Sequence, residues 1–234
     1  MIPSPRELFL HNFVGLYPDA AGGSDADPRK GLGGCIMLRK GELPWVYLPW
    51  PLIIRENRRS DEGMKFASRL SVLEAVAALA LLSSEPAMLK SKAVRIYSDN
   101  MGFVLSYSKG LSTCPYVMTV VMALSAVVRA LDIQLSVLWS PRRTGLGEQI
   151  ADDLSKGSLD DAFSAEPRLR RDPSEIPRTL INWINNPVQS RLLGQAMVEE
   201  ISHKTEVLRW NLECPEEILP FVRAGKRKAC WLEK

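Results

Sequence analysis

The stretch VRIYSDNMG, residues 94–102, ends a run of β-strand character on an aspartate. Apolar side chains at Val94 and Ile96 alternate with Arg95, as in a strand with one buried face, and Asp99 follows with an asparagine and a methionine-glycine pair behind it. Most carboxylates at strand ends are solvated turn residues or helix caps. Asp99 alone therefore does not indicate a functional site. The positions of other acidic residues in the fold decide whether it belongs to one.

A second predicted strand ends in the same way. The sequences LYPD and IYSD each place a tyrosine two residues before an aspartate, Asp19 in the first and Asp99 in the second. The apolar spacing over residues 65–82 predicts a helix between these strands, and a crossover through that helix would make the strands parallel. If they are neighbours, about 4.8 Å apart, both aspartates face one crevice at the carboxyl ends of the strands. Open α/β sheets bind ligands in such crevices.

Glu74 lies on the apolar stripe of the predicted helix, four residues after Leu70, three before Ala77 and seven before Leu81. That stripe should face the sheet. A glutamate at the edge of a nearly apolar helix can also extend its carboxylate to solvent, and this alternative stays open. On a packed face the carboxylate is costly unless a partner satisfies it, and a metal ion is one such partner.

Two further acids, Asp152 and Asp153, lie in EQIADDLSKG, residues 148–157. They follow the last predicted strand in a helix whose first turn can lean over the same crevice. Acids near the beginning of a helix also suit the helix dipole without any ligand, so this motif alone is ordinary helix chemistry.

The order of predicted elements indicates an α/β fold, a mixed sheet with helices on its faces. The predicted strands span residues 8–19, 32–38, 43–50, 93–98 and 133–140, with helices at 65–82, 100–108, 115–131 and 148–156. The first three strands form an antiparallel meander and the last two add to the sheet in parallel. We thus predict a mixed five-stranded sheet, three antiparallel strands then two parallel, flanked by helices.

The chain is predicted to divide near residue 160. Residues 1–160 hold the sheet, whereas residues 161–234 form a proline-punctuated linker and a helical C-terminal extension. Helices are predicted in that extension at 177–185 and 188–209.

Composition limits the possible function classes. The 234 residues contain 30 Lys and Arg against 27 Asp and Glu, a net charge of +3 that neither requires nor excludes nucleic acid. The four cysteines form no C-x-x-C pair and there are only two histidines, which argues against a zinc cluster. The N-terminus MIPSPRELFL lacks signal-peptide features, and the apolar runs are too short for a membrane helix. We expect no membrane association and an intracellular protein, cytoplasmic or nuclear and not secreted.

Together, LYPDAAG, LSVLEAVAAL, IYSDN and EQIADDLSKG resemble the four acidic motifs of type 1 ribonuclease H. The similarity covers residues 8–158 and is greatest to the ribonuclease H domains of retroelement reverse transcriptases, including those of tyrosine-recombinase retrotransposons. It implies a ribonuclease H-like fold and a retroelement-derived, metal-dependent endonuclease that hydrolyses the RNA strand of an RNA–DNA hybrid. The implied catalytic and metal-ligating residues, which would hold two Mg²⁺ or Mn²⁺ ions, are Asp19, Glu74, Asp99 and Asp152. Helical phase alone does not exclude Asp153 in place of Asp152.

The implied chemistry agrees with the residue types. Two hard cations prefer oxygen ligands and together can activate an attacking water and stabilise the leaving 3′ oxygen. Without cations, four acids in one crevice would repel one another and take up protons. The loop SPRRTGLGE lacks the histidine that family members often place there to assist proton transfer or product release, which lowers the expected turnover.

Substrate-binding candidates lie beside the acids. Asn100 is positioned to bond a ribose 2′-hydroxyl, or else to cap the following helix. Arg142 and Arg143 are positioned for phosphate contacts, although paired charges in a loop are usually solvated. We expect three tryptophans in the core rather than against bases: Trp45, Trp50 and Trp139.

Two other functions are compatible with parts of this pattern. A catalytically inactive ribonuclease H-like module would bind nucleic acid, or a protein partner through the C-terminal helices. A 3′–5′ exonuclease of the same superfamily would carry D-x-E in its first motif, but Ala20 and Ala21 follow Asp19 here.

Overall fold

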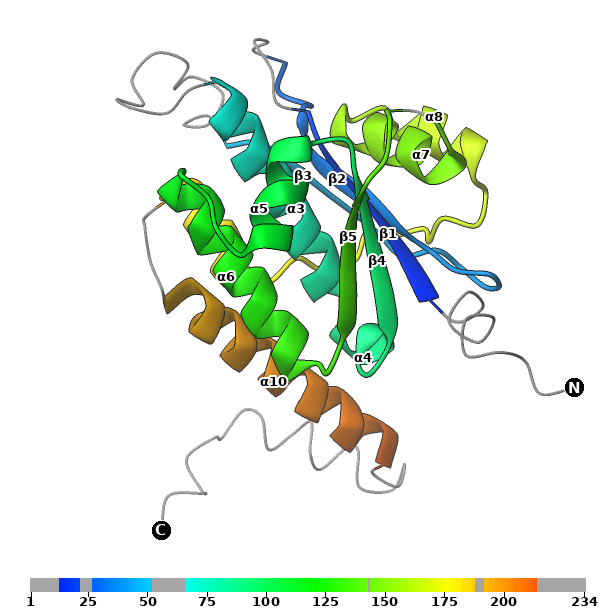
Figure 1. The fold of residues 1–234 in the computed structure, drawn as a ribbon. Helices are drawn as coiled ribbons and strands as arrows, with labels where there is room; N and C mark the ends of the chain where they lie inside the picture. Colours follow the sequence, from blue (N-terminus) through cyan, green and yellow to red (C-terminus); the bar gives the residue numbers. More distant parts are fainter. Residues whose placement is uncertain (1–12, 22–26, 52–65, 143, 188–191, 214–234) are drawn as a thin grey trace, which may run out of the picture.

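The computed structural model describes residues 13–21, 27–51, 66–142, 144–187 and 192–213. Within them the chain forms one five-stranded sheet with the order β3-β2-β1-β4-β5 (Figure 1). The strands are β1 (Phe13–Ala20), β2 (Gly31–Met37), β3 (Trp45–Pro49), β4 (Ala93–Ser98) and β5 (Gln134–Trp139). The first three pair antiparallel, and β4 pairs parallel with both β1 and β5. The predicted mixed sheet, three antiparallel strands then two parallel, is confirmed.

One long helix, α3 (Phe66–Ser84), lies at the centre of the larger core. It is buried continuously from residue 71 to residue 83, because β1 and β2 cover one side and α6 (Pro115–Ala130) covers another. Small side chains such as Ala75, Ala77 and Ala78 permit this close packing. A helix that is apolar nearly all round is buried nearly all round, so its few polar residues need partners.

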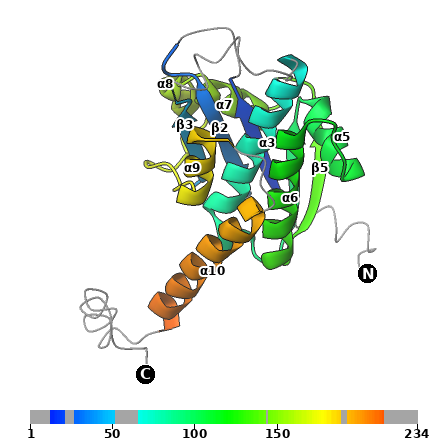
Figure 2. The ribbon, with the colours of Figure 1, turned by 90° about the vertical axis from the view of Figure 1, so that its left-hand side faces the viewer.

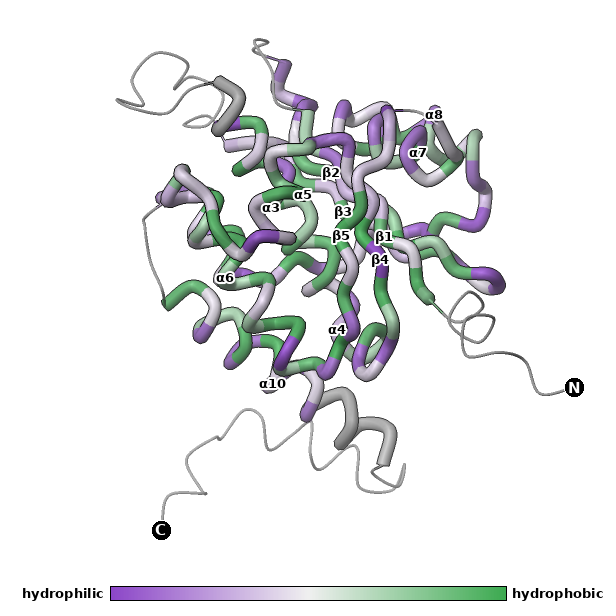
Figure 3. The backbone as a smooth tube through the Cα atoms, in the orientation of Figure 1, coloured by the Kyte–Doolittle hydropathy of each residue, from purple (hydrophilic) through white to green (hydrophobic). Residues whose placement is uncertain are grey.

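The sheet has helices on both faces (Figures 1 and 2). On the α3 face lie α5 (Met101–Lys109) and α6, and Figure 3 shows hydrophobic residues recurring along α6. On the other face α7 (Leu146–Ser155) and α8 (Leu159–Ala165) form a smaller core with β2 and β3. The sequence did not predict α8 or the short α4 (Pro86–Leu89).

The C-terminal segment packs on the α3 face. Helix α9 (Arg178–Asn185) supplies Leu180 to the larger core, and α10 (Leu192–Glu213) lies against α6 and supplies Met197. The predicted helix at 188–209 corresponds to α10, which extends further than expected; residues 188–191 lie outside the described residues. The division of the chain at residue 160 falls within α8 and stays a prediction.

No helix in the described ranges is long and apolar enough to cross a membrane. The intracellular location inferred from the sequence stays a prediction.

Candidate functional site

The ends of β1 and β4 bring two aspartates together. Leu16 on β1 pairs in parallel with Ile96 on β4, and residues 19 and 99 each lie three positions further along. The tyrosines that precede them, Tyr17 and Tyr97, stack with ring centroids 4.9 Å apart and planes 10° from parallel. The repeated Tyr-x-Asp pattern thus reflects two neighbouring strands that end in register.

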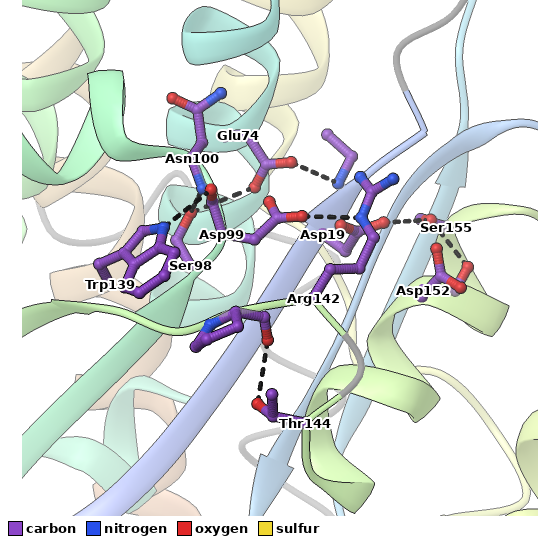
Figure 4. A network of polar contacts seen from close by, with 12 residues as sticks. Asp19, Glu74, Ser98, Asp99, Asn100, Trp139, Arg142, Thr144, Asp152 and Ser155 are labelled. Atoms are coloured by element: carbon purple, nitrogen blue, oxygen red, sulfur yellow. Dashed lines mark hydrogen bonds and ion pairs between the residues drawn. The ribbon is translucent and has the colours of Figure 1, made fainter.

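Glu74 reaches this point from α3 (Figure 4). Its side chain is 4% exposed, so the alternative of a carboxylate extended to solvent is wrong. Oε1 accepts a 3.3 Å hydrogen bond from the backbone N–H of Ala20, and Oε2 accepts a 3.5 Å bond from the hydroxyl of Ser98. One carboxylate therefore contacts the ends of both strands.

Asp19, Glu74 and Asp99 form a compact acidic group. Each contributes one oxygen to a set in which all three atoms lie within 4.8 Å of one another, a spacing that could hold a metal ion. Burial is the main cause that raises the pKa of Glu74 well above its usual value, and the charges of Asp19 and Asp99 add to it. Burial also raises the pKa of Asp19 to about 6. These oxygens suit a hard divalent cation, which would favour their charged forms.

Asp152 lies beside this group rather than within it. It is 3% exposed on α7, and its Oδ2 accepts an ion-paired hydrogen bond of 2.7 Å from Lys156 Nζ. It nevertheless lines the same open pocket of about 390 Å³ as Asp19, Glu74 and Asp99. The neighbouring Asp153 is also buried, and of the two aspartates it is Asp152 that lines this pocket.

Helix α7 can approach the sheet because glycines lie on both sides of the contact, Gly33 on β2 and Gly147 on α7 itself. A Cβ on Gly33 would lie 2.3 Å from the backbone nitrogen of Ser155, and one on Gly147 would lie 2.6 Å from the Tyr17 ring. The close approach lets the hydroxyl of Ser155 donate a 2.5 Å hydrogen bond to Oδ2 of Asp19. The glycines were a signal in the sequence for this contact, but Ser155 itself was not predicted.

Arg142 extends over the acids from the loop after β5. Its Nε lies 2.8 Å from Asp99 Oδ2. Burial alone would lower the pKa of the guanidinium, but the hydrogen bond and charge of Asp99 outweigh it and raise that pKa. Arg142 therefore stays positively charged. Arg143, the other predicted phosphate contact, lies outside the described residues.

Glu148 holds this loop and was not predicted as a site residue. It accepts a 2.5 Å hydrogen bond from the hydroxyl of Ser140, and it lines a smaller hollow with Asp19, Asp99 and Asp152. Its position four residues before Asp152, on the same face of α7, was the available signal.

Asn100 caps α5, one of the two roles that its position allowed. Its Oδ1 accepts hydrogen bonds of 2.9 Å from the N–H of Phe103 and from the hydroxyl of Ser71. A Cβ on Gly102 would lie 2.3 Å from the Ser71 hydroxyl oxygen, so the glycine makes room for that bond. Asn100 also lines the 390 Å³ pocket, and its contact with a ribose stays a prediction.

The three tryptophans have different environments. Trp45 and Trp50 are buried as expected. Trp139 is 49% exposed at the end of β5, and its indole N–H donates a 3.3 Å hydrogen bond to the backbone carbonyl of Asp99. The expectation of a core role was wrong for Trp139, because the end of β5 is exposed, as the 39% exposure of its neighbour Leu138 also shows.

No protein-family model matches the chain, and no curated protein is similar to it in sequence. The arrangement of its own residues therefore carries the functional argument.

Proposed function

We propose that the protein is a metal-dependent endonuclease of ribonuclease H type, retroelement-derived, that hydrolyses the RNA strand of an RNA–DNA hybrid. The observation that carries this proposal is the group of Asp19, Glu74 and Asp99 within 4.8 Å, with Asp152 lining the same pocket. The fold supports the proposal because Asp19 and Asp99 lie at the carboxyl ends of parallel strands, where α/β sheets bind ligands.

In this proposal the four acids would hold two Mg²⁺ or Mn²⁺ ions, which when bound supply an activated water and a stabilised leaving oxygen. Ser155 and the backbone N–H of Ala20 orient the carboxylates of Asp19 and Glu74 through the bonds described above. Arg142 offers positive charge to a phosphate at the mouth of the site. Glu148 keeps the loop that carries Arg142 in place through Ser140.

The test is cleavage of labelled RNA–DNA hybrid, duplex RNA and duplex DNA in Mg²⁺ or Mn²⁺. We expect the hybrid to be cut in its RNA strand, no cleavage in chelator, and a loss of at least about 100-fold in the Asp99→Asn variant. Asp172→Asn, which changes an exposed acid, is the matched control and should cleave like the wild type. Equal cleavage by Asp99→Asn and the wild type would show contamination and end the proposal.

A second candidate is a catalytically inactive module that binds nucleic acid, or a protein partner through the C-terminal helices. The observation in its favour is that Arg142 and Lys156 pair with Asp99 and Asp152, so two of the four acids have partners among the protein's own side chains. Stabilisation by Mg²⁺ that is lost in Asp19→Asn would favour the enzyme. Metal-independent capture of a partner by residues 161–234 within the full chain would favour the module.

A further inference from the structure

Two basic side chains of the site form ion pairs with two of its acids. Arg142 Nε lies 2.8 Å from Asp99 Oδ2, and Lys156 Nζ lies 2.7 Å from Asp152 Oδ2. In both pairs the acid is the more buried partner, with side-chain exposures of 23% against 63% and 4% against 41%. The acids are fixed in the crevice, whereas the cations reach in from its edge. Both long side chains can turn into solvent without a change in the backbone.

Lys156 has an ordinary explanation that must be weighed. It ends α7, where positive charge suits the helix dipole, and it lies four residues after Asp152. Pairs of this kind usually join two solvated side chains. Asp152 is instead 3% exposed and lines a pocket with three other acids, so Lys156 neutralises a charge inside the candidate metal site.

The pocket combines two kinds of charge. The buried acids lie in its interior, and the more exposed Arg142 and Lys156 line it as well, together with Lys30. A divalent cation at the acids would repel a basic side chain from the same carboxylates. A phosphodiester over the pocket would attract that side chain. Arg142 and Lys156 can therefore pair with the carboxylates or, when a cation occupies these, with phosphates.

We propose that Arg142 and Lys156 are exchangeable counter-ions. In the metal-free protein they neutralise Asp99 and Asp152. When divalent cations occupy the acids, both side chains leave them and contact phosphates of a nucleic-acid strand. Lys156 is then a substrate-binding residue alongside Arg142. The phosphate contact rests on the proposed function, whereas the counter-ion role requires only metal binding.

The test measures the affinity of each variant for Mn²⁺ and for nucleic acid, and the two affinities should change in opposite directions. Calorimetric titration with Mn²⁺, without nucleic acid, should give binding about two- to fivefold tighter for Lys156→Gln and for Arg142→Gln than for the wild type, as expected from loss of a partly exposed ion pair. In saturating Mn²⁺, affinity for a hybrid of DNA with 2′-O-methyl RNA should fall by about the same factor. Lys156→Arg retains the charge and should restore both values. Lys92→Gln, an exposed change at the amino end of β4, controls for net charge.

The outcomes separate this inference from the proposed function. Mn²⁺ affinity that is unchanged or weaker in Lys156→Gln, with circular dichroism like that of the wild type, would overturn the counter-ion role alone. The same gain in Lys92→Gln would also overturn it, because a general charge effect would then explain the result. Failure of the wild type to bind Mn²⁺ would overturn both proposals.

Discussion

The hydroxyl of Ser155 donates a 2.5 Å hydrogen bond to Oδ2 of Asp19, joining residues 136 positions apart in the chain. It couples the last turn of α7 to the end of β1, and it lowers the pKa of Asp19 against the effect of burial. We expect Ser155→Ala to raise the pKa of Asp19, since a hydrogen bond to the charged form is lost.

The measurable result is the pH dependence of metal binding. The midpoint of Mn²⁺ binding should move up by about one to two pH units in Ser155→Ala, because a hydrogen bond to a charged group is worth about 1.5 to 3 kcal/mol. Titrations between pH 5 and 8 would show it. Ser125→Ala removes a hydroxyl that bonds to a helix carbonyl on α6 and should leave the midpoint unchanged. An unshifted midpoint in Ser155→Ala would contradict the role of this bond.

The raised pKa of Asp19 predicts a pH-dependent stability in the absence of metal. Burial brings this pKa from 3.8 to about 6 in the folded protein, so between these values the folded state binds more protons than the unfolded state. The Asp19 contribution to the free energy of unfolding therefore falls as the pH rises through this window, by at most roughly 3 kcal/mol. Urea denaturation in chelator at several pH values should show the decline.

The comparison that isolates Asp19 is the difference between the wild type and Asp19→Asn. Only the wild type should lose this contribution on raising the pH, and saturating Mg²⁺ should restore it, because a bound cation favours the carboxylate. Parallel pH profiles for the two proteins in chelator would refute the prediction.

Glu74→Gln should separate stability from metal binding. The neutral side chain removes a charge from a nearly fully buried position, so we expect a free energy of unfolding about 1 to 3 kcal/mol higher in chelator at pH 8. The same variant should lose most of the increase in melting temperature that Mg²⁺ gives the wild type. Glu199→Gln, an exposed change on α10, should alter neither quantity noticeably. A full Mg²⁺ response in Glu74→Gln would remove this residue from the metal site.

Asp152 and Asp153 can be distinguished by a matched pair of variants. Asp152→Asn should reduce metal-dependent cleavage by at least about tenfold, since Asp152 lines the pocket with the other acids. Asp153→Asn should retain cleavage when the assay temperature is chosen so that both variants are equally folded. Rates measured in saturating Mn²⁺ on the same hybrid would decide between them. A larger loss in Asp153→Asn would reassign the fourth acid.

The sequence was sufficient to predict the sheet and to bring the acids together at one end of it. The alternation of apolar and polar side chains predicted the strands. Helical spacing predicted Glu74 on the stripe of α3 that faces the sheet, where the structure has it. The common end of β1 and β4 followed from two assumptions, that the crossover is parallel and that the strands are neighbours. These features depend on local periodicity and a general topological rule.

The contacts around the acids could not be predicted in the same way. The bonds from Ser155 and Lys156 depend on how closely α7 lies against the sheet, which Gly33 permits but no periodicity encodes. Trp139 was expected in the core, yet the end of β5 is exposed, and no alternation of side chains along the sequence shows that. The four-residue α4 and the seven-residue α8 are too short for a helical period to stand out.

Because α3 is buried on nearly every side, metal binding in the crevice should affect the opening motions of the whole domain. Glu74 cannot leave the site without disturbing the helix around which the larger core is built. A cation bound to this carboxylate would therefore slow the opening motions that expose α3 to solvent. Amide hydrogen exchange along residues 71–83 should become slower when the ion binds. A helix buried along residues 71–83 would then report the bound ion.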